Sequence, residues 1–237
     1  MKYYELKLDT KRNGIGSMEQ IINVSWSAHV DSKDSLNKQG LFGPVTGNPP
    51  LPSAEINKKS KVTDYLNFIA ITRDKYLFIS EKFYGFLKTY LKHSHQVWDI
   101  EIRGEGKPLP YKIFHIDYPE KAFINYKRSS FKLVVYNDGA DKDTGTGIQL
   151  FSDKHSLEMS RKHHFSLENP FLKPSKLSFN LSEISRQGLD LIRCANTFIA
   201  GYYVSENLKN AIEKEGFTGM DFTPVEELSH HYEIEII

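Results

Sequence analysis

The sequence predicts an α+β fold, with a mixed sheet, a duplicated strand–helix–strand unit and a strand-rich middle. Two observations predict it. Segments of alternating apolar and polar residues, typical of strands, are interspersed with segments whose apolar residues recur at helical spacing. One pattern also occurs twice, at 76–83 and at 201–208: an apolar run, then Ser-Glu, then an amphipathic helix. With 237 residues, 39% of them hydrophobic, the chain can bury a core.

The repeated pattern extends upstream of its apolar runs. Asp64 begins an Asp-Tyr-Leu triplet before the first run, and Asp190 begins an Asp-Leu-Ile triplet before the second, at nearly the same distance. Ser80 and Ser205 follow the two runs, and each hydroxyl can accept a hydrogen bond from the free amides of a first helical turn. The glutamate after each serine suits the positive end of the helix dipole. Both serines are therefore predicted structural helix caps.

The N-terminal part, residues 1–60, is expected to pack on a main domain formed by residues 61–237. Residues 3–8 and 21–30 are predicted strands because their apolar residues alternate or cluster. Residues 40–52 are rich in glycine and proline. Because proline lacks a backbone donor and fixes φ, this segment is predicted to be a long surface loop.

Helical spacing marks three further segments. The first copy carries an apolar stripe from Phe83 to Leu91, and the second carries Leu208 and Ile212 with Gly216 well placed to end its helix. Residues 180–195 also show helical spacing. We therefore expect a helix in each copy and another before the second.

Strands are predicted through the middle of the chain and near its end. The segment 138–147 is polar and glycine-rich, and we expect a turn or flexible loop there that joins two strands. The segments with alternating or apolar character are 97–103, 111–116, 131–136, 148–151 and 220–222.

Charge and cysteine content exclude several classes of protein. Lys and Arg total 31 against 30 Asp and Glu, so the net charge of +1 gives no general attraction to nucleic acid or to an anionic membrane. We see no signal peptide and no stretch long enough to cross a membrane, and we expect a cytoplasmic protein. The single cysteine, Cys194, lies among apolar residues and is expected to be buried, although a catalytic thiol is the sharper alternative.

One pair of histidines could bind a metal. His93 and His95 lie on the same side of an extended segment. Zinc sites normally use three or four protein ligands, and no third ligand follows at a diagnostic spacing. A histidine near a helix C-terminus is also favoured by the helix dipole. A metal-dependent hydrolase that uses these two histidines with a distant acidic residue is therefore the alternative function.

A second alternative is a nucleic-acid-binding module. Lys121, Lys127 and Arg128 flank Phe123 and Tyr126, a mixture of basic and aromatic residues that could contact nucleic acid. The sequence shows no dinucleotide fingerprint, no phosphate loop and no nucleophile elbow, so no cofactor and no catalytic residue are expected.

Four segments together resemble a known family. They are Asp64-Tyr65-Leu66, Tyr76-Leu77-Phe78-Ile79-Ser80-Glu81-Lys82-Phe83, residues 124–131, and Val204-Ser205-Glu206-Asn207-Leu208 continued through residue 222. Together they resemble a bacterial family first described as a domain of unknown function and later assigned, by gene neighbourhood, to the immunity proteins of polymorphic toxin systems. The resemblance covers roughly residues 60–225. Asn125 departs from the pattern, since an acidic residue is expected there.

The resemblance implies a non-catalytic, antitoxin-like protein of the bacterial cytoplasm. Such a protein binds a cognate secreted toxin domain and blocks it by protein–protein contact. The family provides no catalytic residues that could be transferred to this sequence. From the irregular composition of residues 40–52 and 138–147, we expect these loops to present the binding surface.

Overall fold

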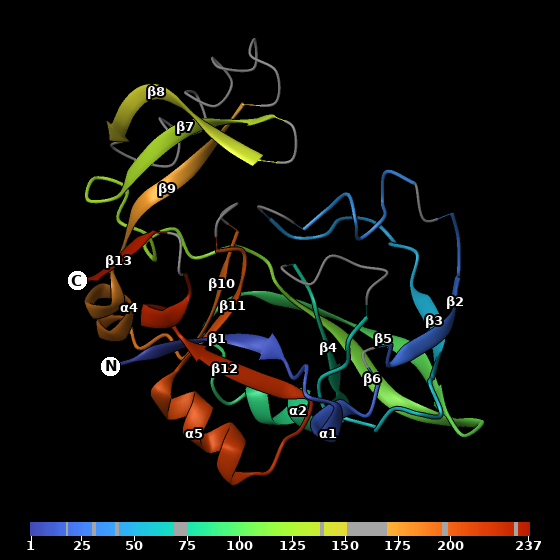
Figure 1. Ribbon diagram of the computed structural model, residues 1–237. Coiled ribbons are helices and arrows are strands. Elements are labelled where there is room, and N and C mark those ends of the chain that lie inside the picture. The colour runs from blue at the N-terminus through green and yellow to red at the C-terminus, as the bar shows by residue number, and fades with distance from the viewer. Residues whose placement is uncertain are drawn as a thin grey trace. The chain divides into compact units, whose positions relative to one another are not determined.

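The computed structural model describes residues 1–17, 19–29, 32–40, 43–68, 75–137, 140–150, 170–195, 199–229 and 232–237. These residues form two compact units, drawn in Figure 1. The larger unit contains residues 1–120 and 188–224, and the smaller contains residues 121–187 and 225–237. Helices and three sheets give the expected α+β class. No helix in the described ranges is long and apolar enough to cross a membrane.

The first sheet of the larger unit combines the N-terminal strand with three strands from residues 191–224. Its strands lie in the order β10 (Leu191–Cys194), β11 (Gly201–Ser205), β1 (Tyr3–Leu8) and β12 (Met220–Pro224), and each is antiparallel to its neighbour. Helix α5 (Glu206–Lys214) connects β11 to β12. The two strands joined by α5 therefore flank β1 and run parallel to each other.

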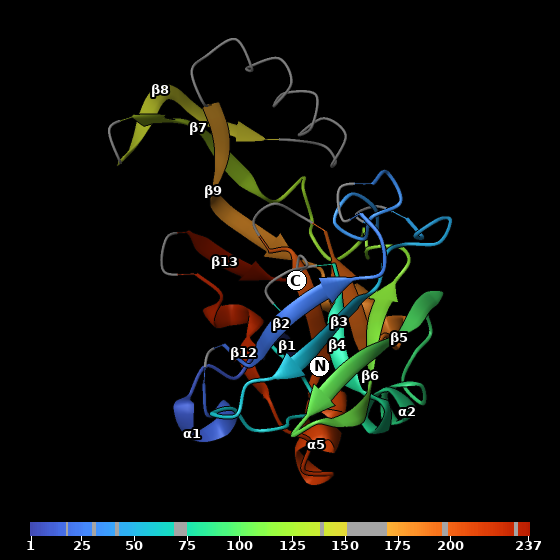
Figure 2. The same cartoon turned by 90° about the vertical axis from the view of Figure 1, so that its right-hand side faces the viewer.

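The second sheet has the order β2 (Ile21–Trp26), β3 (Pro52–Ile56), β5 (His95–Gly104), β6 (Lys107–Ile116) and β4 (Leu77–Ser80). Helix α2 (Glu81–Leu87) connects β4 to β5, and both strands are antiparallel to β6, which lies between them. The α5 and α2 connections therefore have the same form. A short helix, α1 (Arg12–Ile15), precedes β2. Figure 2 shows α2 and α5 at the same end of the larger unit, as does Figure 1.

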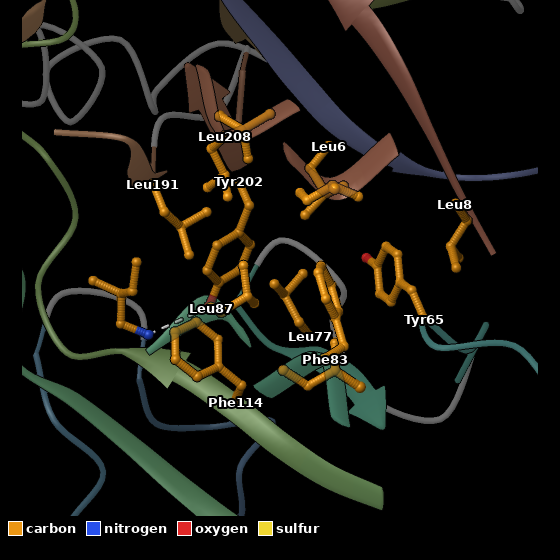
Figure 3. Close-up of a cluster of buried hydrophobic side chains, with 14 residues drawn as sticks. Leu6, Leu8, Tyr65, Leu77, Phe83, Leu87, Phe114, Leu191, Tyr202 and Leu208 are labelled. Carbon is orange, nitrogen blue, oxygen red and sulfur yellow. Dashed lines mark hydrogen bonds between the residues drawn. The ribbon is translucent and has the colours of Figure 1, made fainter. Parts of the chain in front are cut away.

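Two apolar cores stabilise the larger unit. One covers the face of the second sheet that meets loop residues such as Leu36 and Val45. The other is enclosed by strands of both sheets together with α2 and α5, and Figure 3 shows it in close-up. Its buried members are Leu6, Leu8, Tyr65, Leu77, Ile79, Phe83, Leu87, Phe114, Ile116, Leu191, Tyr202, Val204, Leu208 and Ile212.

The smaller unit contains the third sheet, with the order β13 (Glu233–Ile236), β9 (Pro170–Phe179), β7 (Ser130–Asn137) and β8 (Ala140–Leu150). Strand β13 is parallel to β9, and the other pairs are antiparallel. Helix α4 (Leu181–Arg186) follows β9, and the 3₁₀ helix η2 (Val225–Glu227) precedes β13.

The expected loop at 138–147 is wrong over most of its length. Strand β8 begins at Ala140, which pairs with Asn137 at the end of β7, so residues 140–147 belong to a hairpin strand. Asp138 and Gly139 lie outside the described residues. An Asp-Gly pair between two strands is a strong sequence signal for the shortest hairpin connection, and it outweighs the polar composition of the segment.

The expected helix over residues 180–195 is also wrong in its second half. Helix α4 ends at Arg186, and Gly188 then adopts a left-handed conformation with φ +64°. Residues Leu191–Cys194 form strand β10 and are all buried. Because all four residues of β10 are buried, the charged Arg193 among them, its sequence lacks the alternation of apolar and polar residues that identifies a half-exposed strand.

Within the expected loop at 40–52, residues 43–51 form a loop and Pro52 begins β3, and the loop is closely packed on the second sheet. The side-chain amide of Gln96 bonds both backbone groups of Val45, at 2.6 Å and 2.8 Å. The hydroxyl of Tyr76 donates to the carbonyl oxygen of Leu36 at 2.9 Å. Leu36 and Val45 are buried. The burial of Val45 and its two hydrogen bonds to Gln96 fix this loop and make it less suitable as an adaptable binding loop.

Candidate functional site

The first serine of the repeated pattern, Ser80, is the N-cap of α2. Its hydroxyl oxygen accepts a hydrogen bond from the amide of Phe83 at 3.1 Å and donates its proton to Oδ1 of Asp64 at 2.8 Å. The backbone amide of Ser80 also donates to the carbonyl oxygen of Asp64 at 2.8 Å. Both the backbone and the side chain of Asp64 therefore hold the start of α2.

The second serine, Ser205, has the same environment at the N-terminus of α5. Its hydroxyl accepts from the amide of Leu208 at 3.1 Å and donates to Oδ1 of Asp190 at 2.5 Å. Its amide donates to the carbonyl oxygen of Asp190 at 2.8 Å. Helix α5 ends at Lys214 with Glu215 as its C-cap, and the φ of +70° at Gly216 allows the chain to turn away from the helix. Since each serine proton is directed at a carboxylate and its oxygen at a helix amide, these contacts hold helices in place.

Two buried tyrosines complete the correspondence between these sites. The hydroxyl of Tyr111 donates to the carbonyl oxygen of Thr63, the residue before Asp64. The hydroxyl of Tyr3 donates at 2.7 Å to the carbonyl oxygen of Leu189, the residue before Asp190. Burial, together with the nearby carboxylate in each case, raises the pKa of both phenols far above the ordinary value. Both hydroxyls therefore act as permanent hydrogen-bond donors.

The histidine pair occupies two different environments. Nε2 of His95 lies 3.3 Å from the hydroxyl of Tyr84, and its Nδ1 lies 3.3 Å from the backbone oxygen of His93. Burial lowers the pKa of His93. Across the described ranges, no group of three or more His, Cys, Asp or Glu side chains is placed to hold a metal ion.

The basic and aromatic segment from Lys121 to Arg128 belongs to the smaller unit, where two of its members are used internally. Phe123 is fully buried and packs against Phe179, with ring centroids 5.2 Å apart. The guanidinium of Arg128 pairs with Glu235 at 2.5 Å. Neither side chain is presented as an open platform for a nucleic-acid base. Cys194, in β10 of the larger unit, is buried, as its apolar neighbours suggest.

A surface that the sequence did not single out lies beside α2. Phe86, Tyr90 and Phe217 are half-buried, and the ring of Phe86 lies 5.2 Å from that of Tyr90 and 4.9 Å from that of Phe217. We call these three rings the aromatic surface. The sequence carries one signal for this surface. Its apolar stripe is wider than the two positions of α2, Phe83 and Leu87, that are fully buried.

Lysine side chains lie over two of the aromatic rings on and near α2, one of them Phe217 of the aromatic surface. The ammonium of Lys82 is 4.8 Å from the centre of the Phe217 ring, and that of Lys88 is 5.6 Å from the centre of the Tyr84 ring. Such cation–π contacts hold the lysines beside the rings without removing their charge. No protein-family model and no curated protein matches this sequence.

Proposed function

We propose that this protein is an immunity protein, which binds a cognate bacterial toxin domain and neutralises it without catalysis. The observation that carries the proposal is the aromatic surface. Protein interfaces are enriched in aromatic side chains, which supply large contact areas with little loss of conformational entropy. Phe86, Tyr90 and Phe217 form such a group on the larger unit, where each ring keeps part of its area accessible. The family resemblance of the same segments supports the same function.

The rigidity of the surroundings also supports a binding surface. The aromatic surface lies between α2 and the turn after α5. Both helices start at a serine N-cap and pack on the core cluster. A preorganised surface loses less conformational entropy on binding than a flexible one. A protein that inhibits a toxin by contact alone benefits from such a preorganised surface, because more of the contact energy remains as binding affinity.

We further propose that the scaffold is a duplicated unit, as the repeated pattern predicts. The matched environments of Asp64 with Ser80 and of Asp190 with Ser205 support it, as do the matched connections through α2 and α5. The core cluster also divides completely into corresponding pairs. They are Leu77 with Tyr202, Ile79 with Val204, Phe83 with Leu208, Leu87 with Ile212, Tyr65 with Leu191, Phe114 with Leu6, and Ile116 with Leu8.

In the proposed duplication, one strand comes from a different place in the sequence in each copy. Strand β6 fills the central position between β4 and β5 and follows them in the chain. Strand β1 fills the corresponding position between β11 and β12 but precedes them. The second copy is therefore closed by the N-terminal strand, which explains why the first eight residues belong to its sheet.

The test of the proposed function is co-production with the toxin domain encoded by the neighbouring gene. We expect the two proteins to co-purify as a stable complex and the toxic activity to be lost in the complex. A toxin domain from an unrelated system, produced in the same way, is the control and is expected to stay separate and active. Failure of the purified neighbouring pair to associate would refute the proposal for that pair.

A further inference from the structure

The two copies of the proposed duplication differ at one pair of facing positions. One residue beyond the last pair that joins β4 to β6, the first copy has Tyr76 and His115. One residue beyond the last pair that joins β11 to β1, the second copy has Gly201 and Lys7. The correspondence of these positions rests on the proposed duplication, and the contacts of each residue stand without it.

In the first copy, two buried rings fill these positions. Tyr76 and His115 are completely buried, and their ring centroids lie 4.9 Å apart. The hydroxyl of Tyr76 donates to the carbonyl oxygen of Leu36 at 2.9 Å, and it lies 3.2 Å from that of Gln39. A loop of the same chain thus meets the Tyr76 ring and accepts its hydrogen bond.

In the second copy, the same positions border a hollow of about 270 Å³. Gly201 has no side chain, and among the described atoms a Cβ there would meet only Oε1 of Glu5, at 3.7 Å. Lys7 pairs with Glu5 at 2.8 Å, and the Lys7 side chain is 42% exposed. Leu8 and Tyr65 add apolar surface to the walls. Where the first copy holds a buried ring, the second copy is therefore open.

The charges around the hollow favour an uncharged occupant. Glu5 and Lys7 are the charged residues of its lining, and they neutralise each other. An ion gains little from such a pair, whereas an aromatic ring gains free energy from burial against Leu8 and Tyr65. A phenolic hydroxyl can also donate a hydrogen bond to the Glu5 carboxylate.

We propose that this hollow binds a tyrosine side chain of a protein partner, which supplies to the second copy the ring that Tyr76 supplies to the first. The ring packs on Leu8 and Tyr65, and its hydroxyl reaches the ion pair of Glu5 and Lys7. Tyrosine is among the side chains that most often anchor a protein interface in a pocket. The identity of the partner as a toxin domain rests on the proposed function.

The experiment titrates the full-length, ¹⁵N-labelled protein with N-acetyl-tyrosinamide and, separately, with N-acetyl-leucinamide, and follows the backbone amide resonances by NMR. The test variant is Ala200→Trp, because Ala200 lines the hollow and a larger side chain fills it. Thr10→Trp fills it from another lining residue and gives a second test if Ala200→Trp does not fold. Ser182→Trp is the control, since that side chain is exposed on α4 in the smaller unit. Circular dichroism checks that each variant is folded.

We expect saturable shifts at the residues that line the hollow when N-acetyl-tyrosinamide is added to the wild type or to the control. N-acetyl-leucinamide should bind about fivefold more weakly, because it lacks the additional stabilisation of an aromatic contact. The filled variants should show no saturable shift at these residues. The proposal is overturned if the wild type shows none there, if the two probes bind equally, or if a folded filled variant binds as the wild type does.

The neighbouring toxin domain separates this proposal from the proposed function. If it binds the wild type and the filled variants equally, the immunity function stands and the hollow is not a partner site. If it binds none of them, while N-acetyl-tyrosinamide behaves as expected, the tyrosine site stands and the immunity function fails for that toxin.

Discussion

The carboxylate of Asp64 accepts hydrogen bonds from both the backbone amide and the hydroxyl of Thr218, at 3.0 Å and 3.2 Å. Its other oxygen accepts the proton of Ser80. One side chain thus ties the start of α2 to the turn that follows α5. That turn also carries Phe217 of the aromatic surface, so Asp64 helps to position the proposed binding site.

We predict that Asp64→Ala lowers the free energy of unfolding by about 2 kcal/mol, because it removes three hydrogen bonds to a partly buried charged group. Thr218→Ala is expected to cost about 1 kcal/mol. Urea unfolding of both single variants and of the double variant measures the coupling, for which we expect about 0.5–1 kcal/mol. If the effects of the two substitutions are strictly additive, the hydrogen bond between the Thr218 hydroxyl and the Asp64 carboxylate contributes nothing to stability.

The two serine caps are predicted to contribute equally to stability. Ser80→Ala and Ser205→Ala should each lower the free energy of unfolding by about 1–2 kcal/mol, since each leaves a first-turn amide without its acceptor. Ser182→Ala is the control, because that side chain is exposed on α4. Urea unfolding is the measurement, and a large difference between the two cap variants would contradict the proposed duplication.

The corresponding tyrosines provide a second comparison. Tyr3→Phe and Tyr111→Phe each leave a buried carbonyl oxygen, that of Leu189 or Thr63, without its donor, and we expect a loss of about 1–3 kcal/mol for each. The exposed Tyr118, changed to phenylalanine, is the matched control and should cost little. Thermal unfolding distinguishes the results, and a cost no greater than that of the control would show that these hydroxyls do not stabilise the fold.

Because His115 is buried, we expect the free energy of unfolding to depend on pH. Its Nδ1 lies 2.9 Å from the carbonyl oxygen of Lys75, and burial of the ring lowers its pKa below 6.5. The unfolded chain therefore binds a proton near pH 6.5 that the folded protein does not yet bind. The stabilisation of the folded protein that results from this difference is complete above pH 6.5, and it is lost as the pH falls towards the lowered pKa of His115. His115→Gln should make the stability curve flatter between pH 7 and pH 5, and an unchanged slope would contradict this role.

We expect a second loss of stability, at more acidic pH, from the protonation of Glu235 in the smaller unit. The hydroxyl of Ser178 and the guanidinium of Arg128, assisted by Lys176, lower the pKa of this carboxyl from 4.5 to about 2. The stabilisation is complete above pH 4.5 and is lost as the pH falls towards 2. A carboxyl-detected NMR titration should place the Glu235 transition near pH 2, and Arg128→Ala should raise it. Titration near pH 4.5 in the wild type would show that these contacts do not form in solution.

Local features of the fold were predictable from sequence because they depend on neighbouring residues. Ser80, Ser205 and Gly216 identify helix ends through cap chemistry that acts within one turn. Strand β10 was missed because it is buried throughout, and β3 was missed because it begins at Pro52 after a proline-rich segment. In both cases tertiary packing outweighs the local pattern.

The aromatic surface could not be derived in the same way. Phe86 and Phe217 are brought together only by the packing of α2 against the turn after α5. Their sequence signal, a broad apolar stripe, is also what a fully buried helix would show. Only the structure separates the buried residues of that stripe from its half-exposed ones.

The central place of β1 between β11 and β12 also constrains how this protein is made. At ribosomal rates of about 5–20 residues per second, β1 leaves the ribosome roughly 10–40 s before its partners. During that interval both of its edges lack their native pairing, which is a condition that favours aggregation. Lys2, Glu5 and Lys7 place charges along this stretch and would help to keep it from pairing with other chains. The larger unit can therefore close only late in synthesis, when its first strand meets its last.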